Sequence, residues 1–253
     1  RFGNGKAVRS RELIKYVLNG ECGLVEQTMS SDFYSICVVG GTGAEGGGLA
    51  LRWAAHGHRV TIGSRAAARA SDAARELNAI LGKDVLEGVE NSEGAAGADV
   101  IVLTVPFAAQ MSTAEILRPH LAGKILIDVT VPLVPPKVSQ VQLPPSDSCA
   151  VALQEALGDE IRVVSAFQNV SAHKLRVLTA KVDCDVLVSS DSKEARAVGV
   201  RLASDAGLRG IDVGPLANSV VAESLTSVLI WINRIYKIPD AGIRITGLPD
   251  ASP

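Results

Sequence analysis

Residues Val38–Arg65 read VVGGTGAEGGGLALRWAAHGHRVTIGSR, and this stretch decides the fold. The segment that leads into it, Ser35–Val39, is short, apolar and rich in β-branched residues, which predicts a strand. Apolar residues then recur at helical spacing through Leu49, Ala50, Trp53 and Ala54. The glycines between the two patterns therefore lie in a strand-to-helix turn.

The spacing within this turn is that of a dinucleotide-binding fingerprint, formed by Gly41, Thr42, Gly43, Ala44, Glu45 and Gly46. In that motif the first glycine makes the tight turn, the second lets a pyrophosphate approach the backbone, and the third lets the helix pack on the strand. Free N–H groups and the positive end of the helix then face the anion. For the glycine spacing alone, an ordinary flexible turn is the alternative reading.

The second strand of the unit, Arg59–Gly63, supports the fingerprint reading. A protein that prefers NAD places an acidic residue after this strand, where it binds the ribose 2′-hydroxyl. Ser64 and Arg65 stand there instead, and a hydroxyl with a guanidinium suits a 2′-phosphate. The cofactor is therefore expected to be NADP(H). Arg69, one helical turn later, is either a second phosphate ligand or a solvated surface arginine.

Strand and helix patterns alternate along the rest of the chain. Strands are predicted at 99–105, 124–129 and 161–167, and helices at 66–81, 109–117 and 151–157. This alternation indicates an α/β protein with a Rossmann-type, doubly wound, mostly parallel sheet, followed by a smaller C-terminal α/β portion that ends in a long apolar helix, 217–236. The helix is apolar on more than one side, which favours a subunit interface in a homodimer, whereas its polar residues argue against a membrane span.

Three segments follow from these patterns. Residues 1–30 form an N-terminal extension that we expect to be poorly ordered, with a possible short helix at Glu12–Leu18 and with Met29 as a plausible natural start. Residues 31–167 form the NADP-binding Rossmann domain, and residues 168–253 form a smaller C-terminal domain.

Composition excludes several classes of partner and site. A formal net charge of −2 gives no general attraction to nucleic acid or to anionic membranes. The four cysteines and four histidines lack metal-ligand spacing, so no metal site is expected. The cysteine pattern fits the reducing cytoplasm.

The ends of the parallel strands should line one crevice, since ligands of such sheets bind beyond the carboxyl ends of the strands. These ends supply no nucleophile, carboxylate pair or poised lysine, so no catalytic side chain is predicted. Hydride transfer between two bound cofactors has this apolar, hydroxyl-and-amide signature, because the cofactors carry the reactivity.

From Ser35 to Leu248 the chain resembles the NADPH-dependent reductases of the deazaflavin coenzyme F420. The motifs that carry the resemblance are the opening stretch, VIVLTVPF at 100–107, VVSAFQNVSAHKL at 163–175, DVGPLANSVVAESLTSVLI at 212–230 and GIRITGL at 242–248. The resemblance implies an enzyme that moves a hydride between NADP(H) and F420. A reductase of another acceptor, such as a flavin, an imine or a metal chelate, and a non-catalytic NADP(H) sensor are the alternatives.

The resemblance also implies roles for single residues. Thr42, Gly43, Ala44 and Glu45 would contact the pyrophosphate, and Ser64, Arg65 and Arg69 would hold the 2′-phosphate. The nicotinamide half would be bordered by Thr104, Val105 and Pro106, and the deazaflavin by Gln168, Asn169, Val170, Ser171 and Leu216. Family members carry a His-Thr-Ile-Pro type sequence where this chain has Gln168–Ser171, and an amide there is expected to hydrogen-bond a ring carbonyl.

Overall fold

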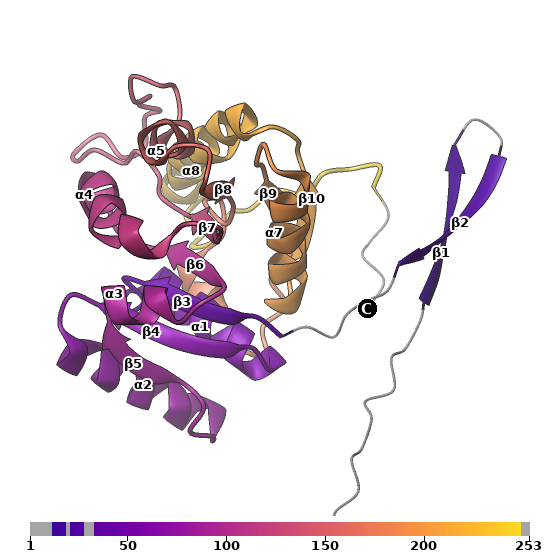
Figure 1. Ribbon diagram of the computed structural model, residues 1–253. Coiled ribbons are helices and arrows are strands. Elements are labelled where there is room, and N and C mark those ends of the chain that lie inside the picture. The colour runs from indigo at the N-terminus through magenta and orange to yellow at the C-terminus, as the bar shows by residue number, and fades with distance from the viewer. Residues whose placement is uncertain (1–11, 19–20, 28–32, 249–253) are drawn as a thin grey trace, which may run out of the picture. The chain divides into compact units, whose positions relative to one another are not determined.

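The computed structural model describes residues 12–18, 21–27 and 33–248, and contacts divide the chain into two units, Arg1–Phe33 and Tyr34–Pro253. In the first unit, β1 (Glu12–Leu18) and β2 (Glu21–Gln27) form an antiparallel pair (Figure 1). The possible helix at Glu12–Leu18 is therefore wrong. This segment is rich in β-branched and aromatic residues, and the Asn19-Gly20 pair that follows it is a strong hairpin signal. The proposed start, Met29, lies outside the described residues.

The second unit is built on a parallel sheet of six strands in the order β5-β4-β3-β6-β7-β8. Its strands are β3 (Ser35–Val39), β4 (Arg59–Ser64), β5 (Glu87–Glu90), β6 (Val100–Leu103), β7 (Ile125–Asp128) and β8 (Arg162–Ser165). The strand order reverses at β3: β4 and β5 lie on one side of it, and β6, β7 and β8 lie on the other. The predicted Rossmann-type fold is confirmed.

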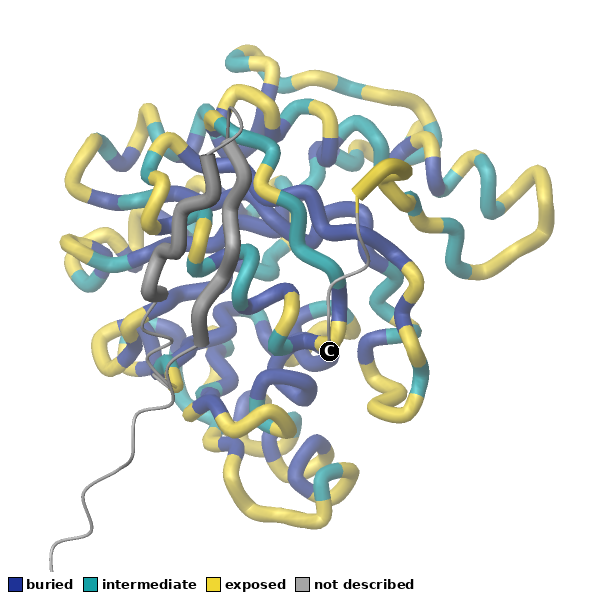
Figure 2. The backbone as a smooth tube through the Cα atoms, turned by 90° about the vertical axis from the view of Figure 1, so that its right-hand side faces the viewer, coloured by how far each residue is buried: buried dark blue, intermediate teal, exposed yellow. Residues whose placement is uncertain are grey.

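Helices cover both faces of this sheet (Figure 1). One face carries α1 (Ala44–His56), α2 (Ala67–Leu81) and α7 (Lys193–Asp205); the other carries α3 (Asn91–Ala96), α4 (Phe107–Leu117) and α5 (Cys149–Leu157). Alternation along β3 divides the core, since Ile36 and Val38 join the first cluster and Cys37 and Val39 the second. Figure 2 shows the buried strands between exposed outer loops.

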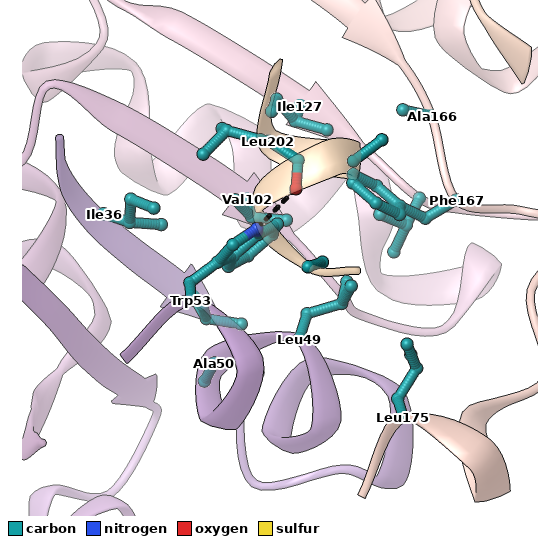
Figure 3. Close-up of a cluster of buried hydrophobic side chains, with 14 of the residues drawn as sticks. Ile36, Leu49, Ala50, Trp53, Val102, Ile127, Ala166, Phe167, Leu175 and Leu202 are labelled. Atoms are coloured by element: carbon teal, nitrogen blue, oxygen red, sulfur yellow. Dashed lines mark hydrogen bonds between the residues drawn. The ribbon is translucent and has the colours of Figure 1, made fainter. Parts of the chain in front are cut away.

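Trp53 on α1 anchors the first cluster (Figure 3). Its indole Nε1 donates to the carbonyl of Leu202 on α7 at 2.8 Å, and its ring meets that of Phe167 edge-on with centroids 5.7 Å apart. An aromatic pair of this geometry adds about 1 kcal/mol to the apolar burial. The dinucleotide-type helix is thus locked to elements from the far end of the chain.

Most of the remaining elements follow β8 in the chain. A short helix, α6 (Ala172–Leu175), packs on α1, and β9 (Asp185–Val188) pairs in parallel with β10 (Arg209–Asp212). The 3-10 turn η1 (Arg118–His120) follows α4, and the 3-10 turn η2 (Leu216–Asn218) precedes α8 (Ser219–Tyr236). The sequence analysis does not predict β5, α3, β9, α7 or β10, because these segments are short or mixed in polarity.

The helix α8 is apolar on two sides. One side packs inward with Ala222 and Leu229, whereas a stripe of Val221, Val228, Trp231 and Ile235 is exposed. By length and composition, the segment Leu216–Tyr236 is long and apolar enough to cross a membrane, a test that helices of globular cores also pass. The buried Glu223 carboxylate on its inner side binds the first residues of α5, which places that side in the protein core.

Candidate cofactor-binding site

The loops that follow β3 and β6 lie side by side at the carboxyl edge of the sheet. Gly40 adopts φ +76°, and a Cβ placed on it would lie 2.9 Å from Cγ1 of Val105 and 3.0 Å from the carbonyl oxygen of Thr104. Only glycine accepts both this backbone conformation and this approach. The glycine turn and the predicted nicotinamide segment Thr104–Pro106 therefore meet at the point where the strand order reverses, where ligands of such sheets bind.

Internal hydrogen bonds hold the glycine turn in place. The N–H groups of Gly40 and Gly41 both donate to the carbonyl of Gly63 at 3.1 Å, and the N–H of Gly43 donates to Gly40 at 3.2 Å. Gly46 packs against Thr104, whose hydroxyl donates to the carbonyl of Val39 at 2.8 Å. These bonds fix the turn before any ligand arrives.

The same turn leaves several donors unused. Within the described chain, the N–H groups of Thr42, Ala44, Glu45 and Gly46 have no hydrogen-bond partner. Thr42, Gly43 and Ala44 are exposed. Unsatisfied N–H groups in the first turn of a helix, together with the positive end of its dipole, are a binding site for an anion.

The predicted 2′-phosphate ligands lie after the neighbouring strand, β4. Ser64 is half-buried and its hydroxyl accepts from the N–H of Ala66 at 3.4 Å. Arg65 and Arg69 are exposed, and neither guanidinium has a hydrogen-bond or ion-pair partner among the described residues. Two uncommitted cations thus stand beside the glycine turn, one helical turn apart.

Glu45 differs from the rest of the turn, because its carboxyl group points into the protein. Its Oε1 atom is buried without a hydrogen-bond partner. The pKa of Glu45 is raised to about 8, mainly because the carboxyl group is buried and secondly because the negative charge of Asp128 lies nearby. Its backbone N–H stays available to a ligand while Oε1 is turned inward, a distinction that the glycine spacing does not reveal.

Asp128, at the end of β7, belongs to a buried group of carboxyls with Glu45 and Glu223. Burial first, and then the nearby Glu223, raise the pKa of Asp128 to about 7, although hydrogen bonds oppose the rise. The bonds come from Thr130, whose hydroxyl donates at 2.6 Å, and from Gln110, whose amide donates at 2.7 Å. This cluster of three carboxyls is not apparent from local patterns, because Glu45, Asp128 and Glu223 are far apart in the chain.

The turn after β8 presents the predicted deazaflavin-binding residues. Phe167 adopts φ +75°, a conformation that a bulky residue accepts only when its surroundings enforce it. Its ring is fully buried against Trp53, and the N–H of Val170 donates to its carbonyl at 3.1 Å. The turn thereby carries Gln168 and Asn169 across the carboxyl edge of the sheet.

Both amide groups of this turn use their donors internally. Nε2 of Gln168 donates to the carbonyl of Asp128 at 2.9 Å and to the hydroxyl of Ser165 at 2.8 Å, and Nδ2 of Asn169 donates to the carbonyl of Asp185 at 2.7 Å. Their oxygens, Oε1 and Oδ1, are buried without partners. These side chains therefore offer acceptors for a ring N–H, whereas the sequence analysis expects donors to a ring carbonyl.

A cleft of about 170 Å³ opens beside this turn. It is lined by Gln168, Asn169, Val170 and Ser171 together with residues of α8 and Ala241. Leu216 does not line it, because this side chain is buried in the core on the α5 face. A larger cleft of about 300 Å³, lined by Ser35, Arg59 and Glu87, lies at the opposite ends of the strands and contains no predicted site residue.

Arg52 on α1 fastens the segment that follows this turn. Its guanidinium is buried and donates to the backbone carbonyls of Lys174, Leu175, Val177, Ala180 and Ala206. Among the residues that the structure describes, no carboxylate pairs with Arg52, and backbone carbonyl dipoles compensate its buried charge. Sequence reasoning treats Arg52 as one more helix residue, since its partners are distant in the chain.

One side-chain cluster has the composition of a metal site. His56, His58 and Asp205 bring their ligand atoms within 4.8 Å of one another. However, Nδ1 of His58 accepts the Tyr34 N–H at 3.0 Å, so Nε2 carries the proton and donates it to Asp205 at 2.9 Å. That nitrogen has no lone pair for a metal, and the cluster instead ties the start of β4 to the end of α7.

Comparisons with known proteins place this chain beside one family of oxidoreductases. Residues 35–132 match the family described as "NADP oxidoreductase coenzyme F420-dependent". The F420-dependent NADP reductase of Methanothermobacter thermautotrophicus is 42% identical over 85% of this chain and 96% of its own length. That of Methanocaldococcus jannaschii is 40% identical over 84% and 98%.

A solved structure from an Arthrobacter species, provisionally described as an F420-dependent NADP reductase, has a TM-score of 0.70 and 27% identity over 84% of this chain and 99% of its own. A pyrroline-5-carboxylate reductase from Coxiella burnetii, with a TM-score of 0.56 and 19% identity over 81% of this chain and 68% of its own, shares the fold.

Proposed function

This chain belongs to the family of coenzyme F420-dependent NADP oxidoreductases, and from this relationship we propose that it is an enzyme that transfers a hydride between NADP(H) and F420. One observation of the site carries the proposal. The unpartnered N–H groups of the α1 turn and the unpartnered oxygens of Gln168 and Asn169 follow strands of one parallel sheet at its carboxyl edge. Two polar ligands can therefore bind along a single edge.

The NADP(H) half of the proposal assigns a part of the cofactor to each loop. The pyrophosphate is held by the N–H groups of the turn from Gly41 to Gly46, and the 2′-phosphate by Ser64, Arg65 and Arg69. Thr104, Val105 and Pro106 border the nicotinamide. The uncommitted state of the two guanidiniums supports this assignment, because no internal ion pair must break when the phosphate binds.

The F420 half assigns the deazaflavin to Gln168, Asn169, Val170 and Ser171, which line the cleft beside α8, whereas Leu216 lies in the core of the α5 face. The two buried amide oxygens fit a ring that presents N–H groups, since an unpaired buried acceptor costs about 1–3 kcal/mol until a donor arrives. Residues 31–167 then form the NADP-binding domain, and residues 168–253 complete the second site.

The chemistry supplied by the bound pair is a hydride transfer between nicotinamide C4 and deazaflavin C5, with one proton taken up when F420 is reduced. The protein positions the two rings, excludes water and supplies hydrogen-bond acceptors. No side chain forms a covalent bond to either ligand in this proposal, so no nucleophile is required.

Single-turnover transfer from NADPH deuterated at C4 tests the proposal. We expect the label to reach the deazaflavin carbon without washing out into solvent, and NADPH to persist when F420 is omitted. Label lost to solvent would contradict direct transfer. Turnover with a flavin, an imine or a metal chelate but not with F420 would point to another reductase, and binding without any turnover to an NADP(H) sensor.

The exposed stripe on α8 supports a narrower proposal on the oligomeric state. Val221, Val228, Trp231 and Ile235 form one apolar face, and a second copy of this chain is proposed to cover it in a homodimer. Sedimentation should find dimers for the natural chain and monomers for Trp231→Glu.

The protein is proposed to act in the cytoplasm, where its buried free thiols Cys37, Cys149 and Cys184 stay reduced.

A further inference from the structure

Arg176 places its guanidinium over α1, next to the glycine turn. A Cβ placed on Gly47 would lie 3.1 Å from Nη2 of Arg176 and 3.8 Å from its Nε. The same point lies 3.2 Å from the carbonyl oxygen of Gly41, which is part of the turn itself. The charged end of Arg176 therefore lies within a few ångströms of the backbone that forms the predicted anion site.

The position of Gly47 on its helix defines what the guanidinium faces. Gly47 follows Gly43 by four residues, so the two share one face of α1 and stand about one turn, or 5.4 Å, apart. A Cβ placed on Gly43 would meet only the carbonyl oxygen of Gly40, at 3.7 Å, so the space above that residue is open. An extended arginine side chain can span one helical turn.

Two contacts with α1 hold Leu175, the residue that precedes Arg176. A Cβ on Gly48 would lie 2.5 Å from Cβ of Leu175, so the absence of a side chain at Gly48 lets α6 rest directly on α1. Arg52, one turn further along α1, donates to the carbonyl of Leu175 at 2.8 Å. The guanidinium of Arg176 is thus delivered to α1 by a rigid attachment.

The charge of Arg176 is uncommitted. The side chain is exposed, and it has no hydrogen-bond or ion-pair partner in the part of the chain that the structure describes. By contrast, the neighbouring Lys174 is paired with Asp240 at 2.5 Å. The turn from Gly40 to Gly48 contains no basic residue, so its own backbone offers a pyrophosphate only partial charges.

We propose that Arg176 is a ligand of the pyrophosphate of NADP(H), and covers this group from the side opposite the glycine turn. The inference rests on the proposed binding of NADP(H) at α1. A guanidinium offers a planar set of donors that matches phosphate oxygens, and it supplies the full charge that the turn lacks. The segment that carries the amide turn, Gln168–Ser171, thereby also contributes to the first cofactor.

The pyrophosphate is common to NADPH and NADH, which distinguishes Arg176 from Arg65. Arg176→Ala should raise the dissociation constants of both dinucleotides by a similar factor, about tenfold or more, because a charge-assisted bond is lost in each complex. Arg176→Lys should restore part of the affinity, since it returns the charge without the fork. Arg65→Ala should weaken NADPH alone.

Calorimetric titration of the purified full-length protein with NADPH and with NADH measures these constants without F420. Arg118→Ala is the matched control, because this exposed arginine lies at the end of α4, where it pairs with Glu115. Melting temperatures of all variants establish that each is folded.

Similar losses for both dinucleotides, with an unchanged control, would support the proposal. Unchanged binding in Arg176→Ala would overturn it, as would a loss confined to NADPH or an effect only on the Michaelis constant for F420. If the natural protein binds neither dinucleotide, the proposed function fails instead, which separates the two outcomes.

Discussion

The guanidinium of Arg52 donates through Nε to the backbone carbonyl of Leu175 at 2.8 Å. This bond joins the helix of the glycine turn to the segment that follows the amide turn, and further bonds from the same guanidinium reach Ala206 at 2.9 Å and Val177 at 2.9 Å. The two proposed ligand sites therefore share one structural support.

Arg52→Met should destabilise the protein by at least about 3 kcal/mol, because it leaves several buried carbonyls without donors. For a domain of this size the melting temperature should fall by roughly 10 °C. Hydrogen exchange should rise first in residues 172–180, whose carbonyls lose their partner. Arg75→Met, at an exposed arginine of α2, should leave both measurements unchanged. Equal exchange across the whole chain would contradict a local role.

Two glycine substitutions should separate binding from folding. Gly43→Ala adds a methyl group in open space at the start of α1, so the melting temperature should hardly change, while NADPH binding should weaken about tenfold or more as the methyl group meets the pyrophosphate. Gly46→Ala drives its methyl group into the hydroxyl of Thr104 and the Cα atom of Gly41, so both stability and binding should fall. Thermal melts and titrations would decide, and full affinity in Gly43→Ala would argue against the fingerprint.

Arg65→Ala should raise the Michaelis constant for NADPH at least tenfold and leave that for NADH nearly unchanged. The reason is that the exposed guanidinium has no internal role, so its loss affects only the 2′-phosphate. Steady-state kinetics with both cofactors checks this prediction. Equal effects on NADPH and NADH would remove the assignment.

Gln168→Ala and Asn169→Ala should each weaken F420 binding or slow hydride transfer by about tenfold to a hundredfold. Both substitutions remove an acceptor that the fold leaves unpaired. Dissociation constants for NADPH should stay constant. Gln142→Ala, which removes a loop amide bound to Val134 and Lys137, serves as the control. If both site variants transfer hydride and bind F420 as the natural protein does, this turn is excluded from the F420 site.

Stability should fall as the pH rises from about 5 to 7. Burial raises the pKa of Glu45 from 4.5 to about 8 and that of Asp128 from 3.8 to about 7, so the folded protein holds protons that the unfolded chain releases. This contribution to stability is complete at a pH below the pKa values of the unfolded chain. It is lost as the pH rises through the pKa values of the folded protein. Each such proton contributes a slope of about 1.4 kcal/mol per pH unit.

Urea titrations across this pH range measure the slope directly. Glu45→Gln should reduce it by the contribution of one proton, because an amide does not titrate. Glu115→Gln, at an exposed carboxyl of α4, should leave the slope unchanged. A natural protein whose stability rises over this range would contradict the assigned buried, protonated carboxyls.

Local patterns along the chain were sufficient to predict much of the fold. The apolar run before Gly40, the helical spacing after Gly48 and the later alternation predict strands and helices that the structure confirms, since each pattern depends on neighbours in sequence. The same local reasoning misread Glu12–Leu18 as a possible helix, because it did not weigh the Asn-Gly pair that follows.

By itself, then, the sequence determined the Rossmann-type fold, the glycine turn and the position of Ser64-Arg65 after the second strand, because fixed spacings within single segments encode them. Only the tertiary structure decided that the Glu45 carboxyl turns inward toward Asp128 and that Gln168 and Asn169 keep acceptors rather than donors. It also decided that Arg52 reaches from α1 to Leu175 and that Arg176 lies against α1 at Gly47. Each of these features depends on hydrogen-bond and packing partners from distant parts of the chain. The spacing of residues within a single segment does not specify such partners.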